Sequence, residues 1–316
     1  MADRTSTGTG PDQAGPDSTE PDRAELDSAG PDRAEPDSAE PDSSGLDRAG
    51  LDSAGLDRAA ELIAGAGAVL VCAGAGMGVD SGLPDFRGDH GFWRAYPPYR
   101  RLGLRFAELA DPAHFAADPA LAWGFYGHRL DLYRRTRPHA GFDVLRSWGA
   151  RVFTSNVDGQ FQRAGFDDVA EVHGSIHRLQ CVEPCTDDVW PADDVEVDVD
   201  PGTMRAAAPL PACRNCGGLA RPNILMFGDW SWVAGPSRRA LDELTAWRRG
   251  VRDLVVLELG AGLAVPTVRR QAELAAAASG ALIRVNPREP EVRHGRGVAL
   301  RMGALEALTE LARRTG

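Results

Sequence analysis

Lysine is absent from the 316 residues, so all 35 basic side chains are arginine. The apolar runs are short, and none approaches the roughly 18 residues that a membrane-spanning helix needs. No basic segment is followed by an apolar one, as in a signal peptide. We therefore expect a cytoplasmic protein that makes no contact with membranes.

Acidic residues are concentrated near the N-terminus. Residues 1–58 contain 15 acids and 5 arginines, whereas residues 59–316 contain 31 acids and 30 arginines. The second segment is almost neutral, which argues against electrostatic capture of nucleic acid or of an anionic membrane.

Residues 1–57 repeat with a period of five, in units such as PDRAE, LDSAG and PDSAE. That period fits neither a helix face nor a strand. Proline and glycine are frequent and large apolar side chains are few, so burial offers little to offset the chain entropy. We predict a disordered acidic tail, with an acidic docking arm as the alternative, and a folded domain over 58–316.

The folded part contains apolar runs that end abruptly in small or polar residues, and helical patterns lie between them. The runs are AVLVCAG from residue 68, RVFTSNVDG from 151, DLVVLELGAG from 253 and ALIRVNPRE from 281. This alternation predicts an α/β fold with a parallel sheet wrapped by helices. Ligands of such folds bind beyond the carboxyl ends of the strands.

A glycine-rich loop, Gly74-Ala75-Gly76, follows the first apolar run. The dinucleotide pattern GxGxxG does not fit it, because Val79 or Ser81 stands where the third glycine belongs. A plain hydride-transfer enzyme is therefore disfavoured. The loop amides are still suited to a pyrophosphate, or the loop packs a helix against a strand.

Four of the five cysteines form two pairs, Cys181 and Cys185, then Cys213 and Cys216. Two cysteine pairs in a cytoplasmic chain are typical of one tetrahedral zinc ion. Four thiolates leave no open position, so the zinc would be structural. Cys72 lies within an apolar run, where we expect it to pack.

Together these segments resemble the signature of the sirtuins, which are NAD-dependent protein lysine deacylases. The resemblance covers about residues 58–312. It rests on Gly74 to Gly76, on Ser81 to Gly88 (SGLPDFRG), on Asn156 to Gly159, on His173-Gly174 and on the cysteines. It implies a Rossmann-like domain with an inserted zinc module at about 178–221, NAD as cofactor, and acyl-lysine proteins as substrates.

The resemblance also implies the residues of the site. His173 would be the general base, as imidazole chemistry allows near neutral pH. Asn156 and Asp158 would be catalytic residues that bind the ribose hydroxyls and line the pocket on the nicotinamide side. His177 is expected to be structural. The implied cofactor contacts are Gly74, Ala75, Gly76, Asp85, Phe86, Arg87, Ser155, Asn156, Asp158, Gly260 and Asn286.

Two further segments bear on the substrate. Met226, Phe227 and Gly228 match an extended segment that pairs with the substrate peptide, as in strand addition. Tyr126 and Arg129 are three residues apart, on one face of a predicted helix, and together suit a carboxylate. They match the pair of sirtuins that remove succinyl or malonyl groups. A surface arginine is the alternative.

Departures from the family pattern keep other functions open. Ser155 stands where the family has glutamine, Gly78 replaces a serine, and the loop after Gly260 is one residue short; Gln160 is a candidate substitute for the missing amide. The alternatives are a protein mono-ADP-ribosyltransferase and a weakly catalytic module that binds NAD or ADP-ribose. The oligomeric state stays open.

Overall fold

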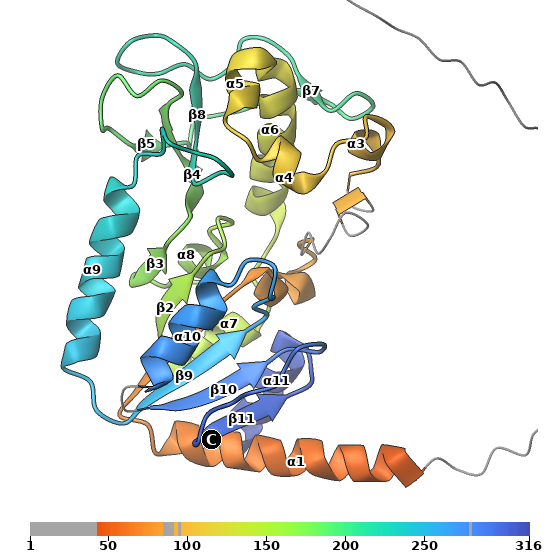
Figure 1. The fold of residues 1–316 in the computed structure, drawn as a ribbon, viewed down its shortest axis with the longest axis vertical. Coiled ribbons are helices and arrows are strands. Elements are labelled where there is room, and N and C mark those ends of the chain that lie inside the picture. The colour runs from red at the N-terminus through yellow and green to blue at the C-terminus, as the bar shows by residue number, and fades with distance from the viewer. Residues whose placement is uncertain (1–42, 85–91, 94–95, 278–279) are drawn as a thin grey trace, which may run out of the picture. The chain divides into compact units, whose positions relative to one another are not determined.

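The larger part of the fold is built on a six-stranded parallel sheet (Figure 1). The candidate site lies at the carboxyl ends of its strands. The computed structural model describes residues 43–84, 92–93, 96–277 and 280–316, with the backbone alone for 43–52. The strand order is β11-β10-β9-β1-β2-β3, and every neighbouring pair is parallel. The strands are β1 Ala68–Ala73, β2 Arg151–Thr154, β3 Val169–Glu171, β9 Leu254–Leu259, β10 Ala281–Val285 and β11 Gly297–Leu300.

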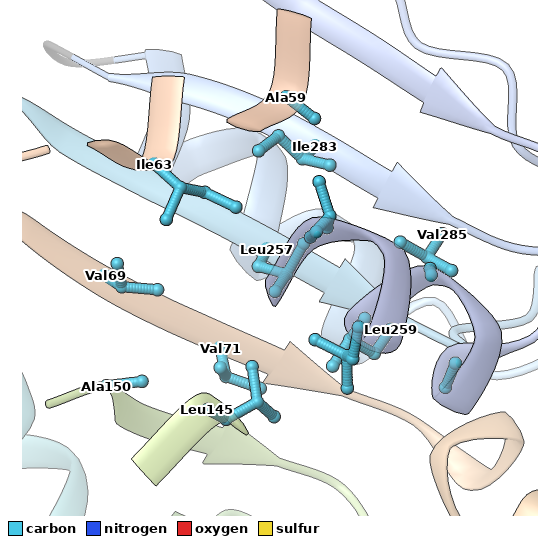
Figure 2. Close-up of a cluster of buried hydrophobic side chains, with 14 of the residues drawn as sticks. Ala59, Ile63, Val69, Val71, Leu145, Ala150, Leu257, Leu259, Ile283 and Val285 are labelled. Carbon is cyan, nitrogen blue, oxygen red and sulfur yellow. The ribbon is translucent and has the colours of Figure 1, made fainter. Parts of the chain in front are cut away.

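Helices cover both faces of this sheet. One face packs against α1 (Ser43–Ala64), α7 (Gly141–Ser147) and α11 (Ala304–Thr315). Figure 2 shows part of this core, where Ile63 of α1 lies over Leu257 of β9 and Ile283 of β10. The other face packs against α9 (Gly235–Arg249) and α10 (Thr267–Ala277).

Burial on both faces explains why these strands read as continuous apolar runs. All six residues of β9 are buried, and so are five of the six in β1. A strand with one solvated face would instead alternate apolar and polar residues. The predicted α/β class with a Rossmann-like parallel sheet is confirmed.

The first helix is longer than the sequence predicted. It begins at Ser43, within the segment 1–57 that we assigned to the tail, so that boundary is wrong. The last three repeat units begin with leucine rather than proline, and Pro41 is the final proline before the helix. Without a proline to interrupt the backbone hydrogen bonds, a Leu- and Ala-rich segment can continue the helix that buries Leu56.

A second group of elements surrounds a three-stranded antiparallel sheet of order β5-β4-β8. Its strands are β4 Gly174–Cys181, β5 Trp190–Pro191 and β8 Ala220–Ile224, and a small hairpin pairs β6 Val199–Asp200 with β7 Arg205–Ala206. The helices are α3 Pro97–Arg101, α4 Phe106–Leu109, α5 Ala113–Ala117 and α6 Pro119–Arg135. Two short helices connect to the large sheet, the 3-10 helix η1 Ala75–Ser81 and α8 Gln160–Arg163.

Helix α6 lies directly against the hairpin because glycine occupies the contact positions. A Cβ atom on Gly124 would lie 1.9 Å from the Met204 carbonyl oxygen, and one on Gly127 would lie 2.7 Å from Val197. Asp118 begins the helix, since its carboxylate accepts the Leu121 N–H and pairs with Arg205. This packing fixes the helix that carries Tyr126 and Arg129.

None of the described helices has both the length and the apolar character that a membrane span requires.

Candidate active site

The glycine loop after β1 is a place of close backbone approach. A Cβ atom on Gly76 would lie 2.6 Å from the Gly260 Cα atom, and Gly260 itself has a φ of +61°. The N–H of Gly74 donates to Leu259 O at 2.9 Å and that of Gly76 to Gly260 O at 3.0 Å. Both N–H groups therefore already donate hydrogen bonds within the protein. The prediction that they donate to a pyrophosphate is wrong for Gly74 and Gly76. Ala75 begins η1.

The end of β2 is tied to the same loop. The Asn156 side-chain nitrogen donates to Gly74 O at 3.0 Å. The hydroxyl of Thr154 accepts the Asn156 N–H at 3.0 Å and donates to Ala73 O at 2.9 Å. Ser155 N–H also points to Ala73 O, at 3.4 Å. Asn156 is thereby held at the carboxyl end of the sheet, where the sequence placed it.

Asp158 is a buried carboxyl group two residues further on. Burial raises its pKa to about 6, although the Gln160 N–H and the positive charge of Arg129 both act to lower it. Its backbone carbonyl accepts a hydrogen bond from His177 Nε2 at 2.9 Å. His177 thus holds this loop in place, in agreement with the structural role that we expected for it.

The side chain of Gln160, the candidate substitute for the missing amide, points into the protein. Its side chain is buried, and its nitrogen donates to Thr136 O at 3.2 Å. Its Oε1 atom is buried and has no hydrogen-bond partner among the described residues. A buried acceptor without a donor is costly, so a ligand amide is a suitable partner for it.

His173 connects the large sheet to the second group of elements. It follows β3 and precedes Gly174, whose φ of +77° and close contact with Asn223 O exclude a side chain there. The His173 carbonyl accepts the Leu225 N–H at 2.9 Å. Burial lowers the pKa of its imidazole because the charged form is disfavoured. The ring is therefore neutral at pH 7, which is the form that a general base requires.

The segment Met226 to Gly228 turns back on itself, whereas the sequence predicted an extended segment. Strand β8 ends at Ile224, and Gly228 has a φ of +66°. Met226 N–H donates to the Asp229 carboxylate at 3.3 Å, and Phe227 N–H donates to Ala110 O at 2.9 Å. The extended prediction is wrong here because Gly228 and the Asp229 side chain close a turn.

Tyr126 and Arg129 both lie in the core, so Arg129 is not a surface arginine. The guanidinium donates to the Tyr133 hydroxyl from Nη2 at 2.7 Å and from Nε at 3.1 Å, and it lies 5.1 Å from the centre of the Phe125 ring. The Tyr126 hydroxyl is buried with no hydrogen-bond partner among the described residues. No prediction from the sequence covered Tyr133, although it stands four residues after Arg129, on the same helix face.

The four cysteines converge as predicted. Sγ of Cys181 lies 3.7 Å from that of Cys216, and Sγ of Cys185 lies 3.7 Å from that of Cys213. A tetrahedral zinc ion with Zn–S bonds of about 2.3 Å holds its sulfur atoms about 3.8 Å apart, whereas a disulfide needs about 2.05 Å. All four sulfur atoms lie within 4.8 Å of one another. The cluster therefore fits one structural zinc ion.

Asn286 holds the loop expected on the adenosine side. Its Nδ2 donates to Ala261 O at 2.9 Å, and its Oδ1 accepts the N–H groups of Arg288 and Glu289 at 3.0 Å. Arg269 donates to the same Ala261 oxygen at 3.1 Å. The side chain is fully buried, and contact with a ribose stays a prediction.

Three of the predicted cofactor contacts, Asp85, Phe86 and Arg87, lie outside the described residues.

Comparisons with known proteins agree with this arrangement. The profile of the Sir2 family matches residues 74–244. "NAD-dependent protein deacylase 1" of Pseudomonas aeruginosa is 34% identical over 260 residues, 80% of this chain and 96% of that protein. "NAD-dependent protein deacylase 2" of Pyrobaculum aerophilum is 38% identical over 175 residues, 54% of this chain and 62% of that protein. The second match thus spans less than two thirds of that relative.

A solved structure is similar over most of the chain. The crystal structure of a Sir2 homolog in complex with NAD has a TM-score of 0.63 at 27% identity, and it covers 81% of this chain and 92% of that one. The chain belongs to the Sir2 family.

Proposed function

We propose that this protein removes acyl groups from lysine side chains of other proteins in an NAD-dependent reaction that releases nicotinamide and O-acyl-ADP-ribose. One observation carries the proposal. The carbonyl of His173 is hydrogen-bonded to Leu225, at the start of the turn expected to hold the substrate. The backbone of the neutral base His173 is thus hydrogen-bonded to the residue that precedes the substrate segment. The side chain of Asn156 is hydrogen-bonded to the glycine loop.

Bound NAD would supply the ADP-ribose group to which the acyl group is transferred. The residues of this chain bind and orient the reacting groups. Asn156 is fixed by Gly74 and Thr154, so its amide oxygen is oriented at the sheet edge for a hydroxyl donor. Asp158, with its raised pKa, carries a proton part of the time near pH 6. His173, neutral through burial, would act as the base for a ribose hydroxyl of the cofactor.

We further propose a preference for acidic acyl groups such as succinyl and malonyl. Arg129 is a cation held in the core of the second group of elements, and the Tyr126 hydroxyl beside it lacks a described partner. A carboxylate at the end of an acyl chain can accept hydrogen bonds from both groups. The guanidinium would then exchange or share its bond to Tyr133.

The experiment is mass spectrometry of acetyl-, malonyl- and succinyl-lysine peptides incubated with the protein, with and without NAD, beside His173→Tyr. NAD-dependent loss of acyl mass that disappears in the variant supports the proposal. Nicotinamide release with ADP-ribose mass on protein would instead favour the transferase. NAD binding without turnover of any peptide would favour the binding module. The cytoplasmic location stays a prediction.

A further inference from the structure

A cleft of about 360 Å³ opens beside the candidate base. It is lined by Val172, Asp229, Trp230, Trp232, Ala234, Ser237, Arg238 and Leu241. Val172 immediately precedes His173, and Asp229 closes the turn that contains Met226 to Gly228. Residues that line the cleft are therefore direct neighbours in the chain of His173 and of the segment that we expect to hold the substrate next to the acyl-lysine.

One of the residues that line the cleft, Trp230, has a solvent-exposed side chain. Trp230 is 99% exposed, and along the same segment Phe227 is 48% exposed. Scattered exposed apolar residues are ordinary. Large aromatic side chains gathered at a hollow next to a reaction site are, by contrast, typical of contact with a partner, where tryptophan often contributes most of the binding energy.

One cationic side chain that lines the cleft has no ion-pair partner among the described residues. Arg238 is exposed in the first turn of α9 and forms no ion pair with any described residue. The carboxylate of Asp229 also lines the cleft, but it is paired with Arg221 and is completely buried. An acidic group that enters the cleft would thus meet the guanidinium of Arg238, which forms no ion pair with the exposed Asp242 one helical turn further on.

We infer that this cleft binds a large apolar or aromatic side chain of the substrate protein, close in sequence to the acyl-lysine, with an acidic residue beside it that pairs with Arg238. The inference rests on the proposed function. The enzyme therefore selects its lysines partly by their flanking residues. Backbone pairing alone would not give such selection, since main-chain hydrogen bonds are common to all sequences.

The test uses peptides with one acyl-lysine in an alanine background. Each flanking position is replaced in turn by tryptophan or by aspartate, and kcat/KM is measured. For the native protein we expect one or two positions at which tryptophan raises kcat/KM about tenfold or more, with a further gain from an adjacent aspartate. Trp230→Ala should reduce the tryptophan effect to below about twofold and leave the all-alanine peptide unchanged. Arg238→Glu should reverse the aspartate effect.

Matched variants separate this site from general effects. Leu274→Ala removes another exposed apolar side chain, on α10, and Arg249→Glu makes the same charge change at the other end of α9. Both should keep the native preferences. Flanking preferences that are absent, or that survive Trp230→Ala and Arg238→Glu, overturn the inference.

Direct binding keeps the inference testable if no peptide is turned over. Fluorescence anisotropy of the same labelled peptides reports affinity without chemistry. Tighter binding of the tryptophan and aspartate peptides that is lost in Trp230→Ala supports the cleft even though the proposed function has failed. Equal affinity for all peptides overturns the inference that the cleft binds flanking residues, whether or not the protein is an active enzyme.

Discussion

Arg221 and Asp229 form an ion pair in which both side chains are completely buried. Arg221 donates from Nη1 and Nη2 to the two carboxylate oxygens, at 2.8 and 2.9 Å. The same carboxylate accepts the N–H groups of Met226 and Ser231. The pair therefore fixes the turn on which both the substrate segment and the adjoining cleft depend.

Arg221→Met should be strongly destabilising. The change leaves the Asp229 charge buried without its partner, and breaking a buried pair in this way costs about 3–5 kcal/mol. Urea unfolding measures the loss. Arg135→Met is the matched control, because it breaks an exposed pair with Asp131 and should cost less than about 1 kcal/mol. Equal, small losses in both variants would show that the buried pair does not hold the turn.

Much of the fold follows from the sequence for a simple physical reason. Strands buried on both faces must be apolar throughout, and the residues that end them must converge at one edge of the sheet. Asn156 was found from that rule together with its motif, and His173 from its motif alone. The four cysteines were found from their spacing, since two closely spaced cysteine pairs are typical of a structural zinc site.

Other features depend on contacts that spacing does not reveal. The sequence predicted an extended segment from Met226 to Gly228, and only the tertiary structure shows the Asp229 carboxylate closing a turn there around Arg221. The N–H groups of Gly74 and Gly76 donate to carbonyl groups at the end of β9, which only the tertiary structure brings next to them. The exposure of Trp230 likewise depends on what surrounds it, since a tryptophan in a sequence more often indicates burial.

Zinc content should follow the cysteine cluster. The native protein should bind one zinc ion per chain, measured by plasma mass spectrometry, and Cys216→Ser should lose it because a hydroxyl is a poor zinc ligand compared with a thiolate. Cys72→Ala should retain the zinc, since Cys72 is buried within β1, away from the cluster. A Cys216→Ser protein that keeps its full zinc content would contradict a four-thiolate site.

The contribution of Glu171 to the stability of the protein should fall as pH rises from about 5 to 8. Burial raises the pKa of this carboxyl from 4.5 to about 7 in the folded protein. A carboxyl group whose folded pKa exceeds its unfolded value binds more protons when folded, so its contribution is present at low pH and is lost as pH rises through 7. Glu171→Gln removes this dependence.

The free energy of unfolding of Glu171→Gln relative to the native protein should therefore increase from pH 5 to pH 8, by on the order of 2–3 kcal/mol. Denaturant unfolding at several pH values measures it. Glu196→Gln, at an exposed position of the chain, is the control and should show no such trend. A difference for Glu171→Gln that is constant with pH would mean that the carboxyl does not titrate in this range.

Arg129→Met should change which acyl group is preferred. If the guanidinium binds the carboxylate of a succinyl group, its removal should lower kcat/KM for the succinyl peptide by about 10- to 100-fold, the size expected for a charged hydrogen bond. The acetyl peptide carries no carboxylate and should change by less than about threefold. Tyr133→Phe is an informative companion, because it removes the hydroxyl that now accepts from Arg129 and leaves the cation in place. The succinyl preference should survive that change, whereas equal losses on both peptides in Arg129→Met would show that Arg129 supports the core rather than selecting the acyl group.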